Sequence, residues 1–227
     1  EWHFACDIYE RKFNKKRTSA LTDVLRAADT VEIDESKSGA PERAVAEYFE
    51  EMNVPTYRSE NHLWRTFFGL LFWELLFADE DAKTHSPFEF LPASLANRSF
   101  WEKQRAEIEE RLSIITDRSL VKKEILKTST RYYGTRNGVF RWRHSMNDAI
   151  FALVDNAPAT SVQRILLNFC KDYLNARYGY PDLMTVDEDG VRFVEVKTEG
   201  DHLRRNQLVR LDQLQQASFR ADVVRVR

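Results

Sequence analysis

The spacing of apolar residues predicts helices along most of the first 179 residues. In "ERAVAEYFEEM", residues 42–52, apolar side chains recur at helical spacing, and Pro55 follows as a stop signal. The run "FFGLLFWELLF", residues 67–77, predicts a buried helix, because it is about half the length that a bilayer requires and contains Glu74. Ser59 is a suitable N-cap before it, which would place Glu60 in the first helical turn.

The pattern changes after a further series of helices. Residues 80–158 read as helices, including one near "EIEERLSII", and "TSVQRILLNFCKDYLNARYG" predicts an amphipathic helix ending near Gly179. Alternation of apolar and polar residues then predicts strands at 182–187 and 191–197, followed by a helix at about 203–216 and a strand in "ADVVRVR". The last third is therefore expected to run helix, hairpin, helix, strand.

Composition adds few constraints to this outline. The 227 residues suffice for one large or two small domains, and the net charge of −2 provides no overall basic field that would indicate nucleic acid. Cys6 and Cys170 form no disulfide or zinc pattern, so we expect a reducing, intracellular location. The chain begins without methionine or a signal peptide, which suggests a piece of a longer protein, and "DESKSGAPE" at 34–42 has the composition of a linker.

The predicted hairpin places charged residues where a plain strand would have apolar ones. If "DEDG" at 187–190 makes the turn, Asp182 lies directly opposite Glu195. A tighter turn centred on Asp189 and Gly190 would instead pair Asp182 with Lys197. Side-chain parity is the same in both registers, so the three charged groups share one face of the sheet while the intervening valines point into the core.

Two carboxylates about 5 Å apart repel one another and destabilise a sheet. A divalent cation bound to both would offset this repulsion. Carboxylate oxygens suit Mg²⁺ or Mn²⁺, and the backbone carbonyl of Val196 could add a ligand. Lys197 could orient an attacking water or neutralise charge on a phosphoryl group, which predicts a metal-dependent phosphodiesterase. The alternative for an isolated Glu-x-Lys triplet is solvated charge, as expected for Glu35–Lys37. Gln207 lies beside the apolar face of the following helix, which looks toward the hairpin.

These residues carry a family resemblance. "GYPDL", "FVEVK" and "DHLRRNQLVRLDQL" resemble the VRR-NUC version of the PD-(D/E)xK nuclease fold. Together with "SENHLWRTFFGLLFWELLF" and "GTRNGVFRW", they are similar to the catalytic part of a Fanconi-associated nuclease, from about residue 42 to the end.

The resemblance implies a nuclease that needs one or two Mg²⁺ or Mn²⁺ ions and cuts branched DNA. Its motif-I glutamate falls on Glu60, its metal-binding pair on Asp182 and Glu195, its lysine on Lys197 and its motif glutamine on Gln207. It further implies 5′ flap endonuclease and 5′-to-3′ exonuclease action in interstrand crosslink repair.

The chain also departs from its relatives. Leu174 and Asn206 stand where human-type relatives have basic residues that grip a 5′ phosphate, so phosphate-anchored stepwise cleavage is not expected.

A basic and aromatic segment, "RYYGTRNGVFRWR" at 131–143, is the candidate DNA contact. Arginines can hold phosphates and exposed aromatic rings can stack on unpaired bases. The alternative is a hairpin or a helix end with buried aromatics and solvated arginines. The full set of arginines expected to contact DNA is Arg136, Arg141, Arg143, Arg177, Arg204 and Arg205.

The sequence therefore predicts an α/β, restriction-endonuclease-like PD-(D/E)xK core, a mixed sheet flanked by helices, with a helical insertion. Residues 42–79 and 159–227 would form the core, 80–158 the insertion, and 1–41 the helical end of a preceding domain. We expect a monomer that acts on branched or flapped DNA away from membranes, in the nucleus or, in a bacterium, the cytoplasm. The sequence does not identify its protein partners in repair. The alternatives are a dimeric Holliday-junction resolvase of the VRR-NUC type and a catalytically silent DNA-binding module.

Overall fold

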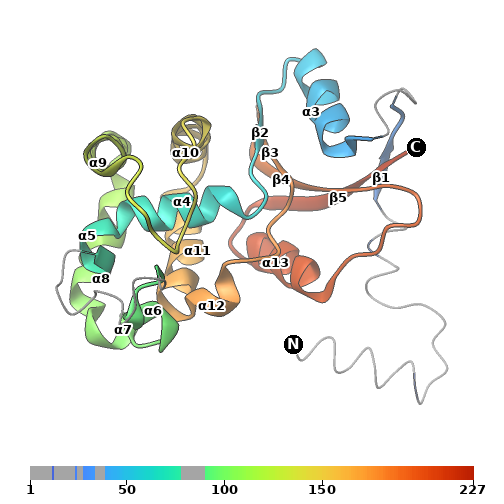
Figure 1. Ribbon diagram of the computed structural model, residues 1–227. Coiled ribbons are helices and arrows are strands. Elements are labelled where there is room, and N and C mark those ends of the chain that lie inside the picture. The colour runs from blue at the N-terminus through green and yellow to red at the C-terminus, as the bar shows by residue number, and fades with distance from the viewer. Residues whose placement is uncertain (1–11, 13–23, 25–27, 34–38, 78–89) are drawn as a thin grey trace.

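The computed structural model describes residues 12, 24, 28–33, 39–77 and 90–227. A five-stranded mixed sheet lies at one end of the molecule, with α3 on one face and α13 on the other, and the helices α4 to α12 gather to its side (Figure 1). The strands are β1 (Asp29–Val31), β2 (Thr56–Arg58), β3 (Leu183–Asp187), β4 (Gly190–Lys197) and β5 (Arg220–Val226). Their order in the sheet is β1-β5-β4-β3-β2. The predicted mixed sheet flanked by helices is confirmed.

The helices follow the predicted outline closely in the segments that flank the sheet. α3 covers Pro41–Glu51, α4 His62–Leu71, α5 Trp73–Phe77, and α13 Arg205–Gln216. The remaining helices are α6 (Ala93–Ala96), α7 (Phe100–Lys103), α8 (Arg105–Ser113), α9 (Arg118–Tyr132), α10 (Ser145–Asn156), α11 (Ala159–Lys171) and α12 (Tyr173–Ala176), with a 3₁₀ turn at Ile114–Thr116. Within the described residues, no helix is both long and apolar enough to cross a membrane.

The β3–β4 hairpin takes the first of the two predicted registers. Asp187 pairs with Gly190, and Leu183 pairs with Val194. This register extends Asp182 toward Glu195 across the two strands. Gly190 has a φ of 94°, a left-handed conformation that a glycine adopts without a Cβ penalty, and this allows the tight reversal.

The two faces of β4 pack against different cores. Val194 and Val196 lie in a small apolar cluster with Val45 and Phe49 of α3, as the alternation predicts. Phe193, on the opposite face, belongs to the main core and packs against Trp64 of α4, with ring centroids 5.8 Å apart. Glu195 and Lys197 follow Phe193 at two-residue intervals, so they share its face and point to the α13 side of the sheet.

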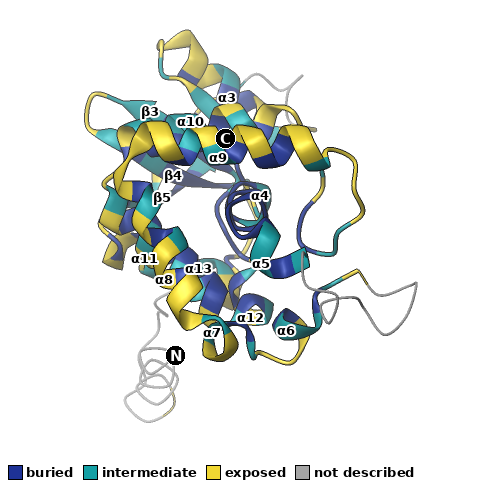
Figure 2. Cartoon of the chain, turned by 90° about the vertical axis from the view of Figure 1, so that its left-hand side faces the viewer, coloured by how far each residue is buried: buried dark blue, intermediate teal, exposed yellow. Residues whose placement is uncertain are grey.

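Helix α4 joins the sheet to the helical layer. It is almost entirely buried at the centre of the helices (Figure 2). The apolar cluster that contains α4 also includes α9, α10 and α11 residues, such as Ile125, Ile150 and Ile165. A Cβ on Gly69 would collide with the ring of Phe140, so the glycine lets the segment after α9 lie directly on α4. The division into nuclease core and insertion stays a prediction, since both parts share this apolar core.

Two local predictions away from the candidate site are wrong. The expected single helix up to Gly179 is broken at Asp172, whose carboxylate accepts a hydrogen bond from the N–H of Asn175 and caps the short helix α12. The segment before residue 34 was expected to be helical, yet Asp29–Val31 forms β1 and pairs in parallel with β5. Most of residues 1–27, most of the expected linker (34–38), and the start of the expected insertion (80–89) lie outside the described residues.

Candidate active site

Asp182 lies where the chain enters β3, held between two neighbouring strands. Its Oδ2 accepts a hydrogen bond of 2.9 Å from the backbone N–H of Val196 on β4. Its backbone oxygen accepts hydrogen bonds from the N–H groups of Ser59, at 2.9 Å, and Glu60, at 3.1 Å, which follow β2. The position of this carboxylate is therefore fixed by the sheet itself.

Glu195 is the most buried charged group of the site, with 1% of its surface exposed. Its Oε1 accepts hydrogen bonds from Lys197 Nζ, at 2.7 Å, and from Gln207 Nε2, at 2.5 Å. Its Oε2 is buried and has no hydrogen-bond partner in the described part of the chain. An unpaired buried carboxylate oxygen is costly, so in a native protein it is expected to meet a cation or an ordered water.

Gln207 is itself oriented by the start of α13. Its Oε1 accepts a hydrogen bond of 2.9 Å from the backbone N–H of Arg204, which leaves its Nε2 free to donate to Glu195. The amide therefore joins the end of the helix to the carboxylate. The sequence-based expectation placed Gln207 on the side of α13 that faces the hairpin, and the structure places it there.

Burial raises the pKa of both acids. Removal from water raises the pKa of Asp182 from 3.8 to about 6, and the pKa of Glu195 from 4.5 to about 7, where the negative charge of Asp182 adds to the effect. The hydrogen bond from Val196 lowers the pKa of Asp182, and the ammonium group of Lys197 opposes both increases. A divalent cation would relieve the same repulsion that protonation relieves.

Glu60 is held next to Asp182 by the hydrogen bond between their backbones. The expected helix start at Ser59 is wrong: α4 begins at His62, and the Ser59 hydroxyl donates to the oxygen of Pro181, at 3.0 Å, instead of capping the helix. Glu60 has a φ of 30° in the turn between β2 and α4. Its negative charge raises the pKa values of Asp182 and Glu195, which places it near both acids.

The carboxylate of Glu60 lies at the surface of the protein. It is exposed and accepts a hydrogen bond of 3.2 Å from Asn61 Nδ2. Within residues 28–33, 39–77 and 90–227, no group of three His, Cys, Asp or Glu side chains is arranged to hold a metal ion. The site thus consists of the buried Glu195, the half-buried Asp182 and a third acid at its edge, and the predicted three-acid ligand set stays a prediction.

A clamp formed by residues 59–61 holds the loop that leads to Asp182. Asn61 Oδ1 accepts hydrogen bonds from the N–H groups of Gly179, at 2.7 Å, and Tyr180, at 3.2 Å. Together with the Ser59 and Glu60 contacts, it joins two segments that are far apart in the sequence. Sequence reasoning missed Asn61, because a polar residue at a helix start is ordinarily read as a cap.

Glu42 is a second residue that the sequence did not single out. It lies in the first turn of α3, and its negative charge raises the pKa of Asp182. The only local signal was an acid at a helix start, which the helix dipole explains equally well. Its relation to Asp182 depends on how α3 packs across β2, β3 and β4.

Residues 117–227 match the family model of the VRR-NUC domain. The match contains Asp182, Glu195, Lys197 and Gln207. This part of the chain is similar to the VRR-NUC domain.

Curated relatives that match 74–89% of this chain are named Fanconi-associated nucleases. The chain is 30% identical over 170 residues to the Fanconi-associated nuclease 1 homolog of Pseudomonas aeruginosa, covering 74% of this chain and 30% of that protein. It is 27% identical over 175 residues to the Arabidopsis thaliana homolog, covering 74% of this chain and 20% of that protein. The Danio rerio nuclease is 26% identical over 219 residues, which are 89% of this chain and 22% of that protein. The chain thus spans at most about a third of these relatives.

Solved structures agree with the family match. The crystal structure of paFAN1 bound to 2-nucleotide 5′-flap DNA with a gap superimposes with a TM-score of 0.78 at 25% identity, covering 97% of this chain and 41% of that one. Its complex with a 1-nucleotide 5′ flap gives a TM-score of 0.79, with the same identity and coverage. The mixed sheet around the VRR-NUC site is therefore the PD-(D/E)xK fold that the sequence predicted.

The arginines expected to contact DNA lie in four places within the matched residues 117–227. Arg141 and Arg143 lie close enough to His62, two residues past Glu60, for their positive charges to act on it. Burial is the main cause of the lowered pKa of His62, and the two arginines lower it further. Arg177 lies over the exposed ring of Tyr178, 4.8 Å from its centroid, and its buried Nε has no hydrogen-bond partner among the described residues. Arg204 and Arg205 begin α13, and Arg136 lies over Phe90. Their contact with DNA stays a prediction.

The aromatic residues of the same segment divide between core and surface. Tyr132, Phe140 and Trp142 pack around Trp73, with ring centroids 5.0 to 6.2 Å away. Phe140 is buried and the other two are partly buried, so the alternative of aromatics packed in the core holds for these three. Tyr133 is 51% exposed and stacks on His144, with centroids 4.6 Å apart. The exposed Tyr133 ring is the one suited to stacking on a base.

Proposed function

We propose that this chain is the catalytic part of a divalent-metal-dependent, structure-specific DNA nuclease that hydrolyses phosphodiester bonds at 5′ flaps. The observation that carries the proposal is the pair of acids, the buried Glu195 and the half-buried Asp182, with one oxygen of Glu195 unpaired and Lys197 beside it. A stable fold gains nothing from burying these charges together, whereas a phosphodiesterase uses them. The nuclease relatives and the flap-bound solved structures support the same class of reaction.

The residues present fit a hard divalent cation. Asp182, Glu195 and Glu60 offer carboxylate oxygens, and the backbone carbonyl of Val196 is adjacent, which is the donor set that Mg²⁺ or Mn²⁺ prefers. The unpaired Oε2 of Glu195 is the atom that most clearly lacks a partner. When bound, one or two such ions would activate water and stabilise charge on the phosphoryl oxygens.

Two further side chains have proposed roles: Lys197 neutralises negative charge, and Gln207 orients the carboxylate of Glu195. Lys197 is 11% exposed and carries a positive charge beside Glu195, where it can hold the attacking water or balance the negative charge that develops on the phosphate. Gln207 fixes the plane of the Glu195 carboxylate, because its amide is held at both ends. Lys197 is therefore proposed as a catalytic residue and Gln207 as a positioning residue.

The form of DNA is proposed from the relatives. The two solved structures hold 5′-flap DNA, and the family resemblance of the sequence implies 5′ flap endonuclease and 5′-to-3′ exonuclease activity in repair, including interstrand crosslink repair. Leu174 stands at one of the positions where human-type relatives have phosphate-gripping residues, and it packs against the apolar core. We therefore propose cleavage that does not depend on a 5′ phosphate anchor at this position.

A product map tests the proposal. Labelled 5′ flap, 3′ flap, nicked and four-way substrates would be incubated with Mn²⁺ or with a chelator, and cleavage of the 5′ flap in Mn²⁺ alone is the expected result. Symmetric cutting of the four-way junction by a dimer, with the mass measured in solution, would replace the proposal with a resolvase. Binding of flap DNA without cleavage under any metal condition would replace it with a non-catalytic module.

A further inference from the structure

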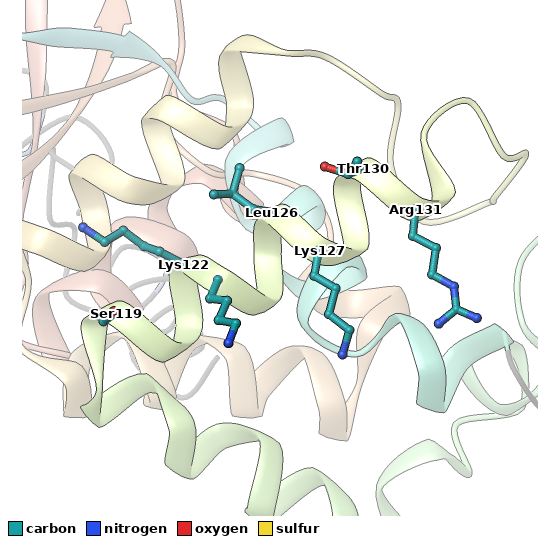
Figure 3. A pocket seen from close by; sticks show the side chains of 7 residues that line it. Ser119, Lys122, Leu126, Lys127, Thr130 and Arg131 are labelled. Carbon is teal, nitrogen blue, oxygen red and sulfur yellow. The ribbon is translucent and has the colours of Figure 1, made fainter.

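The outer face of α9 is a basic surface that the proposed active site does not use. A shallow, open hollow of about 650 Å³ runs along it, lined by Ser119, Lys122, Lys123, Leu126, Lys127, Thr130 and Arg131 (Figure 3). Four of these seven residues are cations, and none is an acid. Because the chain as a whole has a net charge of −2, this face is a local concentration of positive charge. We call the seven residues the α9 surface.

Much of this charge is available to a ligand. Lys122 is paired with Asp155 at 2.8 Å and turns away from the others (Figure 3). Lys127 and Arg131 have acidic neighbours only at 3.7 and 3.8 Å, and their side chains are 60% and 65% exposed. Lys123 has no ion-pair partner among the described residues. Exposed pairs of this kind contribute little to stability, so a strongly charged ligand can displace them at small cost.

The spacing of the cations suits a regular row of phosphates. Lys123, Lys127 and Arg131 follow one another at four-residue intervals, which places them on one side of the helix with a rise of about 6 Å between neighbours. The Lys127 and Arg131 side chains extend to the same side of α9 (Figure 3). The hydroxyl groups of Ser119 and Thr130 can donate to phosphate oxygens as well. From residue 119 to residue 131 the surface is about 18 Å long.

The chemistry favours duplex over single-stranded DNA. The α9 surface includes no aromatic side chain, and unpaired bases are held chiefly by stacking on aromatic rings. A duplex presents closely spaced phosphates to a straight, rigid helix and needs no stacking. The exposed Tyr133, just past the end of α9, is better suited to the unpaired bases of a flap.

The segment that follows α9 connects the end of the α9 surface to the region of the active site. The chain leaves α9 at Tyr132 and passes through the segment that carries Arg136, Arg141 and Arg143. The last two bring positive charge to His62, beside Glu60. Basic groups therefore lead from the site, along this segment, to the end of α9.

We propose that the α9 surface binds the sugar-phosphate backbone of a duplex arm of the DNA substrate. The inference rests on the proposed function and adds the place where the arm lies. Bound there, a duplex would run from the site across the segment 133–144 and along α9. Its phosphates would fix the position of the junction without reading sequence.

The test compares two double variants that remove the same charge. Lys123→Gln/Lys127→Gln alters the α9 surface, and Lys103→Gln/Arg105→Gln alters exposed cations on α7 and α8. Affinity for a labelled 5′ flap with duplex arms would be measured in a chelator, over a series of salt concentrations. The first variant is expected to bind several-fold more weakly. The plot of log affinity against log salt should become less steep by about 2, since each lost phosphate contact reduces the magnitude of its slope by about 1. The second is expected to match the wild type.

The outcomes separate this inference from the proposed function. Equal affinity and slope for both variants and the wild type would overturn it, and would leave the α9 surface to a protein partner. An equal loss on a single-stranded oligonucleotide would also overturn the assignment to duplex. Melting temperatures of both variants in chelator check the fold. Binding is read without cleavage, so an enzyme that failed to cut any substrate would refute the proposed function while this measurement still stood.

Discussion

The two faces of strand β4 show opposite ways of using buried positions. On the α3 face, Val194 and Val196 pack against Val45 and Phe49, and every group in this cluster is apolar. Burial of such side chains contributes about 1.5–3 kcal/mol each relative to exposure. This face stabilises the sheet and needs no partner from outside the chain.

On the α13 face the same strand places Glu195 and Lys197 at the positions that continue from Phe193. Burying these charges is unfavourable, and the pKa of Glu195 rises to about 7 as a result. The difference between the faces indicates that one was shaped for stability and the other for a ligand. Changes on the two faces should therefore separate activity from stability.

The largest expected effect is on cleavage. Asp182→Ala should lower the cleavage rate at least about 100-fold, because the carboxylate proposed to hold the cation at the scissile phosphate is lost. Affinity for flap DNA in chelator should change little. Asp189→Ala, at an 84% exposed position in the turn of the same hairpin, is the matched control and should cut normally. Retained cleavage in Asp182→Ala would refute the mechanism.

The α13 face should also make the metal-free protein sensitive to pH. The pKa of Glu195 is raised from 4.5 to about 7 on folding, so the folded state holds this proton more tightly than the unfolded state. Its contribution to stability is complete below about pH 4.5 and is lost as the pH rises through about 7. The loss amounts to about 3 kcal/mol, and Asp182, with a pKa raised to about 6, acts in the same direction.

Urea unfolding in chelator from pH 5 to pH 8.5 measures this dependence. Glu195→Gln should make it clearly weaker, since the amide does not titrate and only the contribution of Asp182 is left. Added Mn²⁺ should stabilise the wild type more at pH 8 than at pH 6, because the cation and the proton compete for the same oxygens. A wild-type profile as flat as that of Glu195→Gln would show that the buried acid does not control stability.

A substitution on the α3 face should lower stability and leave the cleavage rate unchanged. Val194→Ala removes two buried methyl groups and should lower the free energy of unfolding by about 1–3 kcal/mol. The cleavage rate per folded molecule, measured well below the melting temperature, should be unchanged. A large loss of rate with little loss of stability would mean that the two faces are not independent.

The sequence predicted the hairpin and its charges because these depend on local alternation. Glu195, Lys197 and the inward-pointing valines follow from the two-residue period of a strand, whichever register the turn selects. The register itself was left open between two turns, and the short loop at Glu188 and Asp189 decides it. Local patterns therefore carried the part of the site that one hairpin builds.

The rest of the site depends on packing between distant segments. Glu60 was found only through the family resemblance, and Glu42 and Asn61 were missed, since their relation to Asp182 arises when β2 and α3 join the sheet. The break at Asp172 was missed for a different reason: a side-chain cap ended a helix whose apolar pattern continues. Periodicity reports which face is buried, and it does not report what lies against that face.

The smallest effect concerns the clamp that joins these distant segments. Asn61→Ala removes the acceptor for Gly179 and Tyr180 and the donor to Glu60. Because groups that orient metal ligands typically contribute 10- to 100-fold in metal affinity, the Mn²⁺ concentration that gives half-maximal thermal stabilisation should rise about 10-fold. Asn156→Ala, which removes an exposed amide bonded to Ala152, is the control. A lower melting temperature in chelator with an unchanged Mn²⁺ midpoint would assign Asn61 to the fold alone, and the edge of the site would then owe its geometry to β2 and β3 without the clamp.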